Sequence, residues 1–296
     1  MADHVIDTKL PISVVIATLG GEVLKSTIAH LNRGTGVPAE ILICIPESDA
    51  ANADCVSAVA NVHVIKTPVR GQVAQRAVGL AKAKCPYVMQ FDDDVILPHE
   101  TLRGMFDVLL AKGAGNVVAP FFRVQPTGFD GTRYDEGLRG FAKSCYYTLI
   151  CGAGFGRARL GRIAFSGIGF GVPMSTGSER VVESDWLPGG VALCYKENLI
   201  KEDYYPFSGK AFSEDLVHSV LWRKRGCRLW TVLDVSAMVD VSVESFEWKS
   251  VIGRYRAHAY VAKLIDGNVW RTRLWFAFYC LLNIRRLLVQ NSIKSR

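Results

Sequence analysis

The sequence of 296 residues lacks the features that mark several classes of protein. Its eight cysteines include no CxxC pair, and the N-terminal MADHVIDTKLP has no basic region followed by an apolar run. We therefore expect reduced, mostly buried thiols in a cytosolic protein without a secretory signal. Basic residues are dispersed, and zinc-finger or RNA-binding signatures are missing, so nucleic acid is not an expected partner.

Long apolar runs are also missing. The uncharged stretch from Leu274 to Ile284 is well short of the roughly 20 residues that a spanning helix needs. Its aromatic residues and flanking arginines suit a helix lying on an anionic membrane surface, and the alternative is a helix packed on the domain. The flanking arginines are Arg271, Arg273, Arg285 and Arg286.

The composition that is present suits a large globular core. Hydrophobic residues make up 49% of the chain, enough for one large domain with or without a small appendage. The formal net charge of +7 suits an anionic partner, and nucleotides or phospholipid surfaces both qualify.

Short apolar runs alternate with helical patterns in the first hundred residues. The pattern predicts buried strands at 12–21, 40–46, 62–68 and 87–94, with helices at 23–31 and 71–83. This alternation indicates an α/β fold with a mostly parallel sheet, in which ligands bind beyond the carboxyl ends of the strands. The glycine-rich segment 151–173 contains no GxGxxG fingerprint and is not expected to form a long helix.

Three consecutive carboxylates, Asp92, Asp93 and Asp94, follow the fourth predicted strand. Alternate residues of an extended segment lie on one side, so Asp92 and Asp94 can converge while Asp93 points elsewhere. Carboxylate oxygens at a rigid strand end suit a divalent cation beside a diphosphate. The alternative is an acidic strand end in water.

A second acidic pair, Glu214 and Asp215, begins a helix predicted from Ser213 to Gly226, with Ser213 as its N-cap. Acids in a first turn are favoured by the helix dipole, so these two residues can be structural. The preceding WLPGG segment predicts a tight turn, in which Trp186 is either a sugar platform or a core residue.

Together, five segments stand in the order found in family 2 glycosyltransferases of the GT-A fold, which the sequence resembles from about Ile12 to about Ser245. The segments are SVVIATLGG, GQVAQRAVGL, YVMQFDDDVIL, WLPGGVALCYKENL and FSEDLVHSVLWRKRG. The resemblance implies a single GT-A-type domain over 1–245, with a nucleotide-sugar half at about 1–120 and an acceptor half at about 121–245. Residues 246–296 are expected to form an amphipathic helical, membrane-associating extension.

The resemblance also implies an inverting transfer of a sugar from a nucleotide-diphosphate sugar to a hydroxyl, with Mn²⁺ or Mg²⁺ bridging the diphosphate. Asp215 then resembles the general base, with Glu214 orienting it or the acceptor. The expected metal ligand is Asp94, and the expected acceptor contacts are Trp186, Gly189 and Gly190. The expected nucleotide-sugar contacts are Thr18, Gln75, Arg76, Asp92 and Asp93.

Two departures from the family pattern stand out. The second strand ends in CIPESDA where the family carries an acidic turn that holds the base, so Glu47 or Asp49 is the candidate substitute. The histidine that often serves as a further metal ligand is missing, and Asp240 stands near its place as either a hard ligand or a polar strand end.

The leading hypothesis is a cytoplasmic transferase, peripheral on the inner face of the cell membrane, that acts on a glycan or lipid-linked acceptor in polysaccharide or glycolipid assembly. One alternative is a sugar nucleotidyltransferase, for which the first loop supplies Gly20, Gly21 and Lys25. Another is a non-catalytic membrane-surface protein on a decayed transferase fold, and the presence of Asp94 and Asp215 argues against it.

Overall fold

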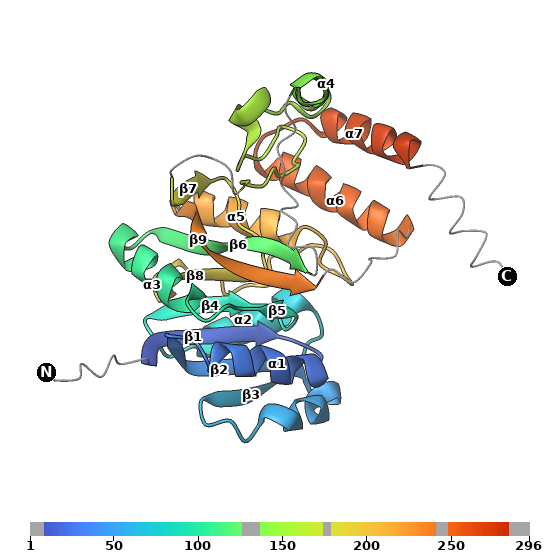
Figure 1. Cartoon of the computed structure of the whole chain (residues 1–296). Helices are drawn as coiled ribbons and strands as arrows, with labels where there is room; N and C mark the ends of the chain where they lie inside the picture. Colours follow the sequence, from blue (N-terminus) through green and yellow to red (C-terminus); the bar gives the residue numbers. More distant parts are fainter. Residues whose placement is uncertain (1–8, 126–136, 174–178, 241–247, 284–296) are drawn as a thin grey trace, which may run out of the picture.

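The computed structural model describes residues 9–125, 137–173, 179–240 and 248–283 (Figure 1). Within these residues a sheet of nine strands runs in the order β3-β2-β1-β4-β8-β6-β9-β5, and β7 pairs with β9. The strands are β1 (Lys9–Ala17), β2 (Val37–Pro46), β3 (Val62–Thr67), β4 (Tyr87–Phe91), β5 (Val95–Ile96), β6 (Asn116–Gln125), β7 (Val181–Ser184), β8 (Val191–Tyr195) and β9 (Arg228–Asp240).

The first half of the sheet is parallel, as the alternating pattern predicts: β1 pairs in parallel with β2 and β4, and β2 with β3. The direction changes at β8, which is antiparallel to both β4 and β6, while β6 and β9 are parallel. The result is a mixed, largely parallel sheet, which confirms the predicted fold class.

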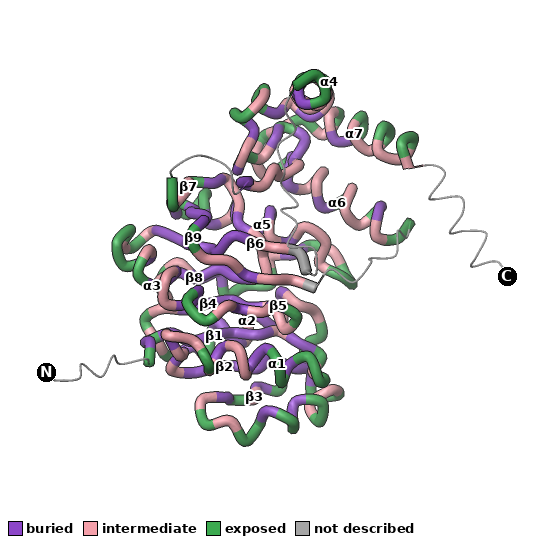
Figure 2. The backbone as a smooth tube through the Cα atoms, viewed as in Figure 1, coloured by how far each residue is buried: buried purple, intermediate pink, exposed green. Residues whose placement is uncertain are grey.

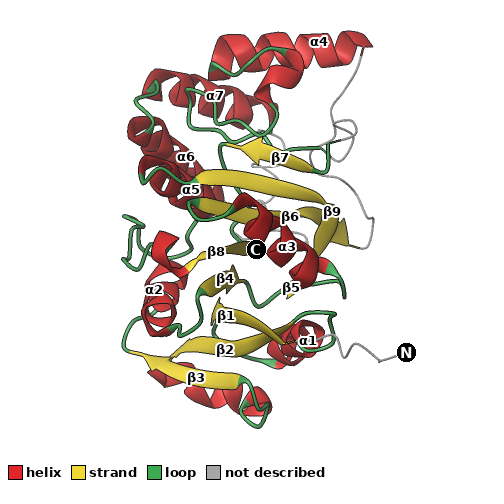
Figure 3. Ribbon diagram, turned by 90° about the vertical axis from the view of Figure 1, so that its left-hand side faces the viewer, coloured by secondary structure: helices red, strands yellow, loops and turns green. Residues whose placement is uncertain are grey.

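Helices cover both faces of the sheet, because parallel strands are apolar on both sides (Figure 3). Helices α1 (Glu22–Leu31), η1 (Glu47–Val56) and α3 (Thr101–Lys112) share one hydrophobic cluster, to which β1 contributes Ile12, Val14 and Ile16. Helices α2 (Gln72–Lys82) and α5 (Glu214–Lys224) share the cluster on the other face, to which β1 contributes Val15.

The remaining helices gather at the β7 end of the sheet (Figure 1). They are α4 (Gly137–Tyr146), η2 (Tyr147–Cys151), η3 (Gly156–Arg159), α6 (Trp248–Leu264) and α7 (Val269–Leu282), and a short η4 (Lys196–Asn198) lies elsewhere. Helix α6 packs on α5 through Val261, and α7 packs on α6 and η2. The predicted C-terminal helical extension is therefore present and anchored to the domain.

Within the described part of the chain, every helix is too short or too polar to cross a membrane. Helix α7 buries only Thr272 fully, and large apolar side chains remain on its outer side. Arg285 and Arg286, expected to flank this helix, lie outside the described residues.

Candidate active site

The pairing of β4 with β8 brings the aspartate triplet beside the two glycines of WLPGG. Phe91 pairs with Val191, and one residue further on the Asp92 amide donates to the Gly190 carbonyl at 2.9 Å. The Gln90 side chain donates to the Gly189 carbonyl at 3.0 Å. Segments almost a hundred residues apart in sequence therefore form one rigid edge of the site.

The three aspartates differ in their partners and in their exposure. Asp92 accepts from Arg76 Nη2 at 2.9 Å and from Gln72 Nε2 at 3.0 Å, both on α2. Asp93 accepts from the Thr18 hydroxyl at the end of β1, so it faces the predicted nucleoside side of the sheet. Asp94 is exposed. Asp92 and Asp93 therefore have separate partners, in keeping with the expectation that Asp93 points away from Asp92, and the expected convergence of Asp92 and Asp94 stays a prediction.

Arg76 forms two buried salt bridges. Its side chain is 2% exposed, and its two terminal nitrogens contact Asp92 at 2.9 Å and Glu214 at 2.8 Å. Arg76 is therefore not a solvated surface charge. Because both carboxylates attract it, the pKa of Arg76 lies above its usual range in spite of burial. The two salt bridges tie the triplet on β4 to the first residue of α5.

Glu214 and Asp215 occupy different environments although they are adjacent. Glu214 is buried between Arg76 and the Tyr204 hydroxyl, which donates to it at 2.6 Å. Asp215 is half-buried, and burial together with the neighbouring charge of Glu214 raises its pKa to about 7. A carboxyl with a pKa near neutrality can accept a proton from a substrate at physiological pH.

Ser213, the residue before this pair, departs from the prediction. It is the N-cap residue, but its side chain makes no capping hydrogen bond, and its backbone is left-handed with φ of 50°. A left-handed backbone in a non-glycine residue is strained, and such strain is concentrated at functional sites. The acidic pair is therefore presented by a strained turn instead of by a capped helix start.

Sequence reasoning did not identify Tyr204 or His218, which back the acidic pair. His218 is fully buried, stacked on Trp222 with ring centroids 3.6 Å apart and tilted against Tyr204 at 4.8 Å. Among the described residues, neither ring nitrogen of His218 has a hydrogen-bond partner, and burial lowers its pKa well below the usual value. Tyr204 lies outside the five segments of the family resemblance, and His218 lies inside the last of them without an assigned role. The fold brings the loop before α5 against the inner face of that helix.

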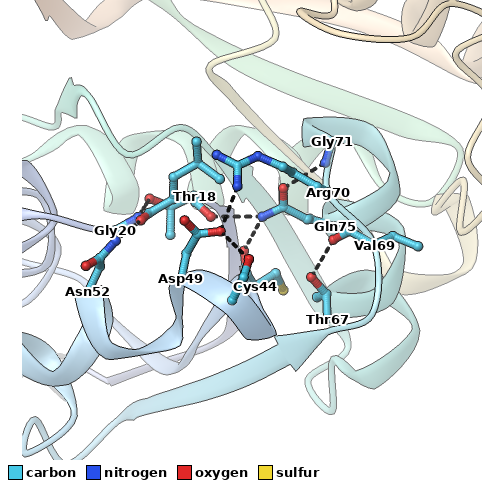
Figure 4. Close-up of polar contacts among 12 residues, drawn as sticks. Thr18, Gly20, Cys44, Asp49, Asn52, Thr67, Val69, Arg70, Gly71 and Gln75 are labelled. Carbon is cyan, nitrogen blue, oxygen red and sulfur yellow. Dashed lines mark hydrogen bonds and ion pairs between the residues drawn. The ribbon is translucent and has the colours of Figure 1, made fainter.

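The side of the site predicted to bind the nucleoside is built around Gln75, which is buried (Figure 4). Its amide nitrogen donates to the carbonyls of Thr18 at 2.9 Å and Cys44 at 2.8 Å, and its oxygen accepts from the Gly71 amide at 3.0 Å. Gln75 thus fixes the ends of β1 and β2 against α2. Its predicted contact with the nucleotide stays a prediction, as does that of Thr18.

Asp49 stands where the family's acidic turn is altered. Its carboxylate accepts from Arg70 at 2.9 Å beside Thr18 and Gln75 (Figure 4). Arg70 is 61% exposed, so this pair lies at the open edge of the strand ends. Of the two candidate substitutes, Glu47 and Asp49, it is therefore Asp49 whose carboxylate is held at this edge by an ion pair.

The WLPGG segment packs directly on the acidic pair. A Cβ atom on Gly189 would lie 2.8 Å from Glu214 Oε1 and 3.1 Å from the Asp215 Cβ, so a side chain at this position would displace one of the two carboxylates. Trp186 is half-buried, and its indole nitrogen donates to the Phe170 carbonyl at 3.0 Å. It lines a small apolar pocket together with Phe122, Phe170 and Pro188.

The described residues contain no group of three His, Cys, Asp or Glu side chains that could hold a metal ion by itself. Asp94 fits a smaller role, because its exposed carboxylate forms no hydrogen bond or ion pair with another described residue. One such carboxylate can serve a hard cation whose other ligands are phosphate oxygens and water. Asp240 ends β9, and its side chain lies outside what the structure describes.

Comparisons with known proteins agree with this geometry. The family model for glycosyl transferase family 2 matches residues 13–167. Two solved structures share the fold. One is "GalNAc-T7 with UDP, GalNAc and Mn2+", at 14% identity and a TM-score of 0.56, covering 86% of this chain and 48% of that one. The other is S. aureus TarS 1-349, at 15% identity and a TM-score of 0.55, covering 89% and 68%.

The chain therefore spans about half the length of the GalNAc-T7 chain. No curated protein matches the sequence. The likeness to the two solved structures establishes the GT-A fold, and the family model shows the family.

Proposed function

The chain belongs to glycosyl transferase family 2, and on that premise we propose that it is an inverting transferase with Asp215 as its general base. It moves a sugar from a nucleotide-diphosphate donor to a hydroxyl acceptor. The observation that carries the proposal is the raised pKa of Asp215, about 7, at a half-buried position tied to the donor-side aspartates through Glu214 and Arg76.

The chemistry requires a base because an alcohol is a poor nucleophile at neutral pH. As the acceptor oxygen bonds to the anomeric carbon, the bond from that carbon to the diphosphate oxygen breaks and the hydroxyl proton passes to the Asp215 carboxylate. Glu214 is held by Arg76 and Tyr204, so its charge stays beside Asp215 and keeps that carboxylate basic. A single displacement of this kind inverts the anomeric centre.

The donor is assigned to the carboxyl ends of β1, β2 and β4. Thr18, Asp92 and Asp93 lie there, and Gln75 and Arg76 position them from α2. Asp94, with the donor phosphate oxygens, would hold Mn²⁺ or Mg²⁺, which neutralises charge on the departing diphosphate. GalNAc-T7, which shares the fold, was solved with UDP and Mn²⁺.

The acceptor is assigned to the side of WLPGG, where Gly189 adjoins the acidic pair, the Gly190 carbonyl accepts from the Asp92 amide, and Trp186 lines the neighbouring apolar pocket. We propose a glycan or a lipid-linked acceptor in polysaccharide or glycolipid assembly, met at the cytoplasmic face of an anionic membrane. Support for the membrane comes from the C-terminal helix, whose exposed side chains include Trp270, Leu274 and Phe278.

The test is a thermal-shift panel of UDP, GDP, CDP and ADP, each with and without Mn²⁺. A ligand that binds only the folded protein raises its Tm by mass action, so one nucleotide should give a metal-dependent shift that names the base of the donor. In Asp94→Ala the metal-dependent part should vanish while the Tm without ligand stays close to wild type. A full shift in Asp94→Ala would remove Asp94 from the metal site, and no shift with any nucleotide would contradict the donor class.

A further inference from the structure

The largest group of exposed apolar side chains lies at the β7 end of the molecule, on two segments distant in sequence. Of sixteen exposed large hydrophobic residues in the described part of the chain, ten belong to residues 137–170 and 269–283. We call these two segments the docking end. Its exposed members are Leu138, Phe141, Leu149, Phe155, Phe165, Trp270, Leu274, Phe278, Leu281 and Leu282.

The two segments form one structural unit. Tyr146 at the end of α4 packs edge-on against Phe278 of α7 at 5.9 Å between ring centroids. The Arg271 guanidinium donates to the carbonyl of Leu149 at 2.5 Å, and the Thr272 hydroxyl donates to that of Ser166 at 2.9 Å. Figure 2 shows the exposed turns of α4 and α7 on the outer side of this end, away from the sheet. The exposed side chains of the two segments therefore belong to one packed unit.

The charge of the docking end has one sign. Residues 137–170 and 269–283 contain seven arginines and lysines and no aspartate or glutamate. The formal net charge of the whole chain is +7, so these segments account for all of its excess positive charge. Arg273 lies over the Trp270 ring at 4.6 Å, an arrangement that keeps a cation beside an exposed aromatic.

Exposed aromatic and aliphatic side chains interspersed with arginines match the boundary between the headgroups and acyl chains of an anionic bilayer. A water-soluble surface rarely leaves so many large apolar groups uncovered without a partner. We infer that the docking end binds an anionic phospholipid membrane through α4 and the following loops together with α7, and that α7 alone is insufficient. This inference rests on the proposed membrane location and identifies the surface responsible for it.

The docking end is also connected to the active site through packed helices. Helix α6 joins α7 to α5, the helix that begins with Glu214 and Asp215. Val261 of α6 is buried in the same cluster as Val217 and Val220 of α5. A membrane held by the docking end is therefore connected through packed helices to the acceptor side of the site, where a lipid-linked acceptor would arrive.

The experiment is cosedimentation of the full chain with vesicles of equal parts phosphatidylcholine and phosphatidylglycerol, compared with phosphatidylcholine alone. Wild type should bind the anionic vesicles, and salt should weaken the binding. The variant pair Leu138→Ser with Phe141→Ser on α4 should lower partitioning at least about tenfold, as should Trp270→Ser with Leu274→Ser on α7. The matched control is Val23→Ser with Leu110→Ser, two exposed apolar residues on α1 and α3, and it should bind like wild type.

Each variant is first checked for an unchanged Tm and an unchanged nucleotide-induced shift, which separates this inference from the donor assignment. Normal vesicle binding by the α4 pair, with loss in the α7 pair, would overturn the two-segment surface while leaving α7 as a membrane helix. Absence of wild-type binding would overturn the inference and the membrane location together. A wild-type dimer that both variant pairs dissociate, without vesicle binding, would assign the surface to a second copy of the chain and overturn the inference.

Discussion

Replacing Arg76 by methionine should destabilise the protein far more than the same change at Arg70. Both arginines contact an aspartate at 2.9 Å, but Arg76 is 2% exposed and Arg70 is 61% exposed. Methionine fills much of the volume of the side chain and removes the charge, leaving Asp92 and Glu214 without their shared cation. Removing one partner of a buried ion pair costs about 3–5 kcal/mol, whereas an exposed pair is worth about 0–1 kcal/mol.

These energies translate into a measurable difference in Tm. At roughly 2–4 °C for each kcal/mol, Arg76→Met should lower the Tm by roughly 6–20 °C. Arg70→Met should lower it by no more than about 4 °C. Differential scanning calorimetry of the two variants beside wild type measures both shifts under one condition.

The pH dependence of the Tm deficit tests whether the uncompensated carboxylate of Asp92 causes it. In the wild type, burial raises the pKa of Asp92 to about 6, and Arg76 opposes that rise. Without Arg76 the pKa of Asp92 should rise further above its unfolded value of about 3.9. An acid whose pKa is raised in the folded state binds its proton more tightly when the protein is folded. Its charged form therefore lowers the free energy of unfolding. This loss of stability is complete above the folded pKa and decreases as the pH falls through it.

The Tm deficit of Arg76→Met should therefore shrink between about pH 8 and about pH 5. Adding Glu214→Gln to Arg76→Met should recover part of the loss, because one uncompensated carboxylate is gone. Equal deficits in Arg76→Met and Arg70→Met, or a deficit that does not change with pH, would refute the buried salt bridges as the source of the stability.

The remaining predictions concern turnover, measured with the donor that the nucleotide panel identifies. Asp215→Asn should keep the nucleotide-induced thermal shift and lose transfer, and near-normal turnover would exclude Asp215 as the base. Glu214→Gln removes the charge that helps to raise the pKa of Asp215 to about 7, so the rise of kcat/KM with pH should move to lower pH; an unmoved profile would mean that another group titrates. Gly189→Ala should lower kcat more than Gly190→Ala. Its Cβ would meet Glu214 Oε1 at 2.8 Å, whereas that of Gly190 would meet only Phe122 and Val95 side chains at 3.2 Å, and similar losses would contradict a positional role.

Local patterns in the sequence were sufficient for the first four strands and for helices α1 and α2, but not for η1, β5 or α3. Strands such as β1 and β4 are mostly apolar because both of their faces are covered, and that property is visible residue by residue. The position of Asp92 at a strand end, and that of Asp215 in the first turn of a helix, follow from the same patterns. The family resemblance added the order of the segments and the roles that it implies.

The side-chain contacts of these site residues could not be predicted in the same way. They depend on which segments meet in the folded protein, and local sequence patterns do not show that. Arg76 has helical neighbours on either side, and nothing local indicates that it is buried between a strand end and a helix 138 residues further on. Tyr204 lies outside the family segments and His218 has no role assigned by them, yet Tyr204 donates to Glu214 and His218 packs against Tyr204. The side chain of Ser213 suggested a cap, but the left-handed backbone at that position is imposed by the tertiary structure.

Periodicity and motif order are properties of the chain, so the sequence alone was enough to predict the early strands and helices, the family, and the residue types at the site. Which charges are buried together and which surface stays apolar depend on which segments meet in space. Burial links these outcomes, because it controls the pKa of Asp215, the contribution of Arg76 to stability, and the exposure of α4 beside α7.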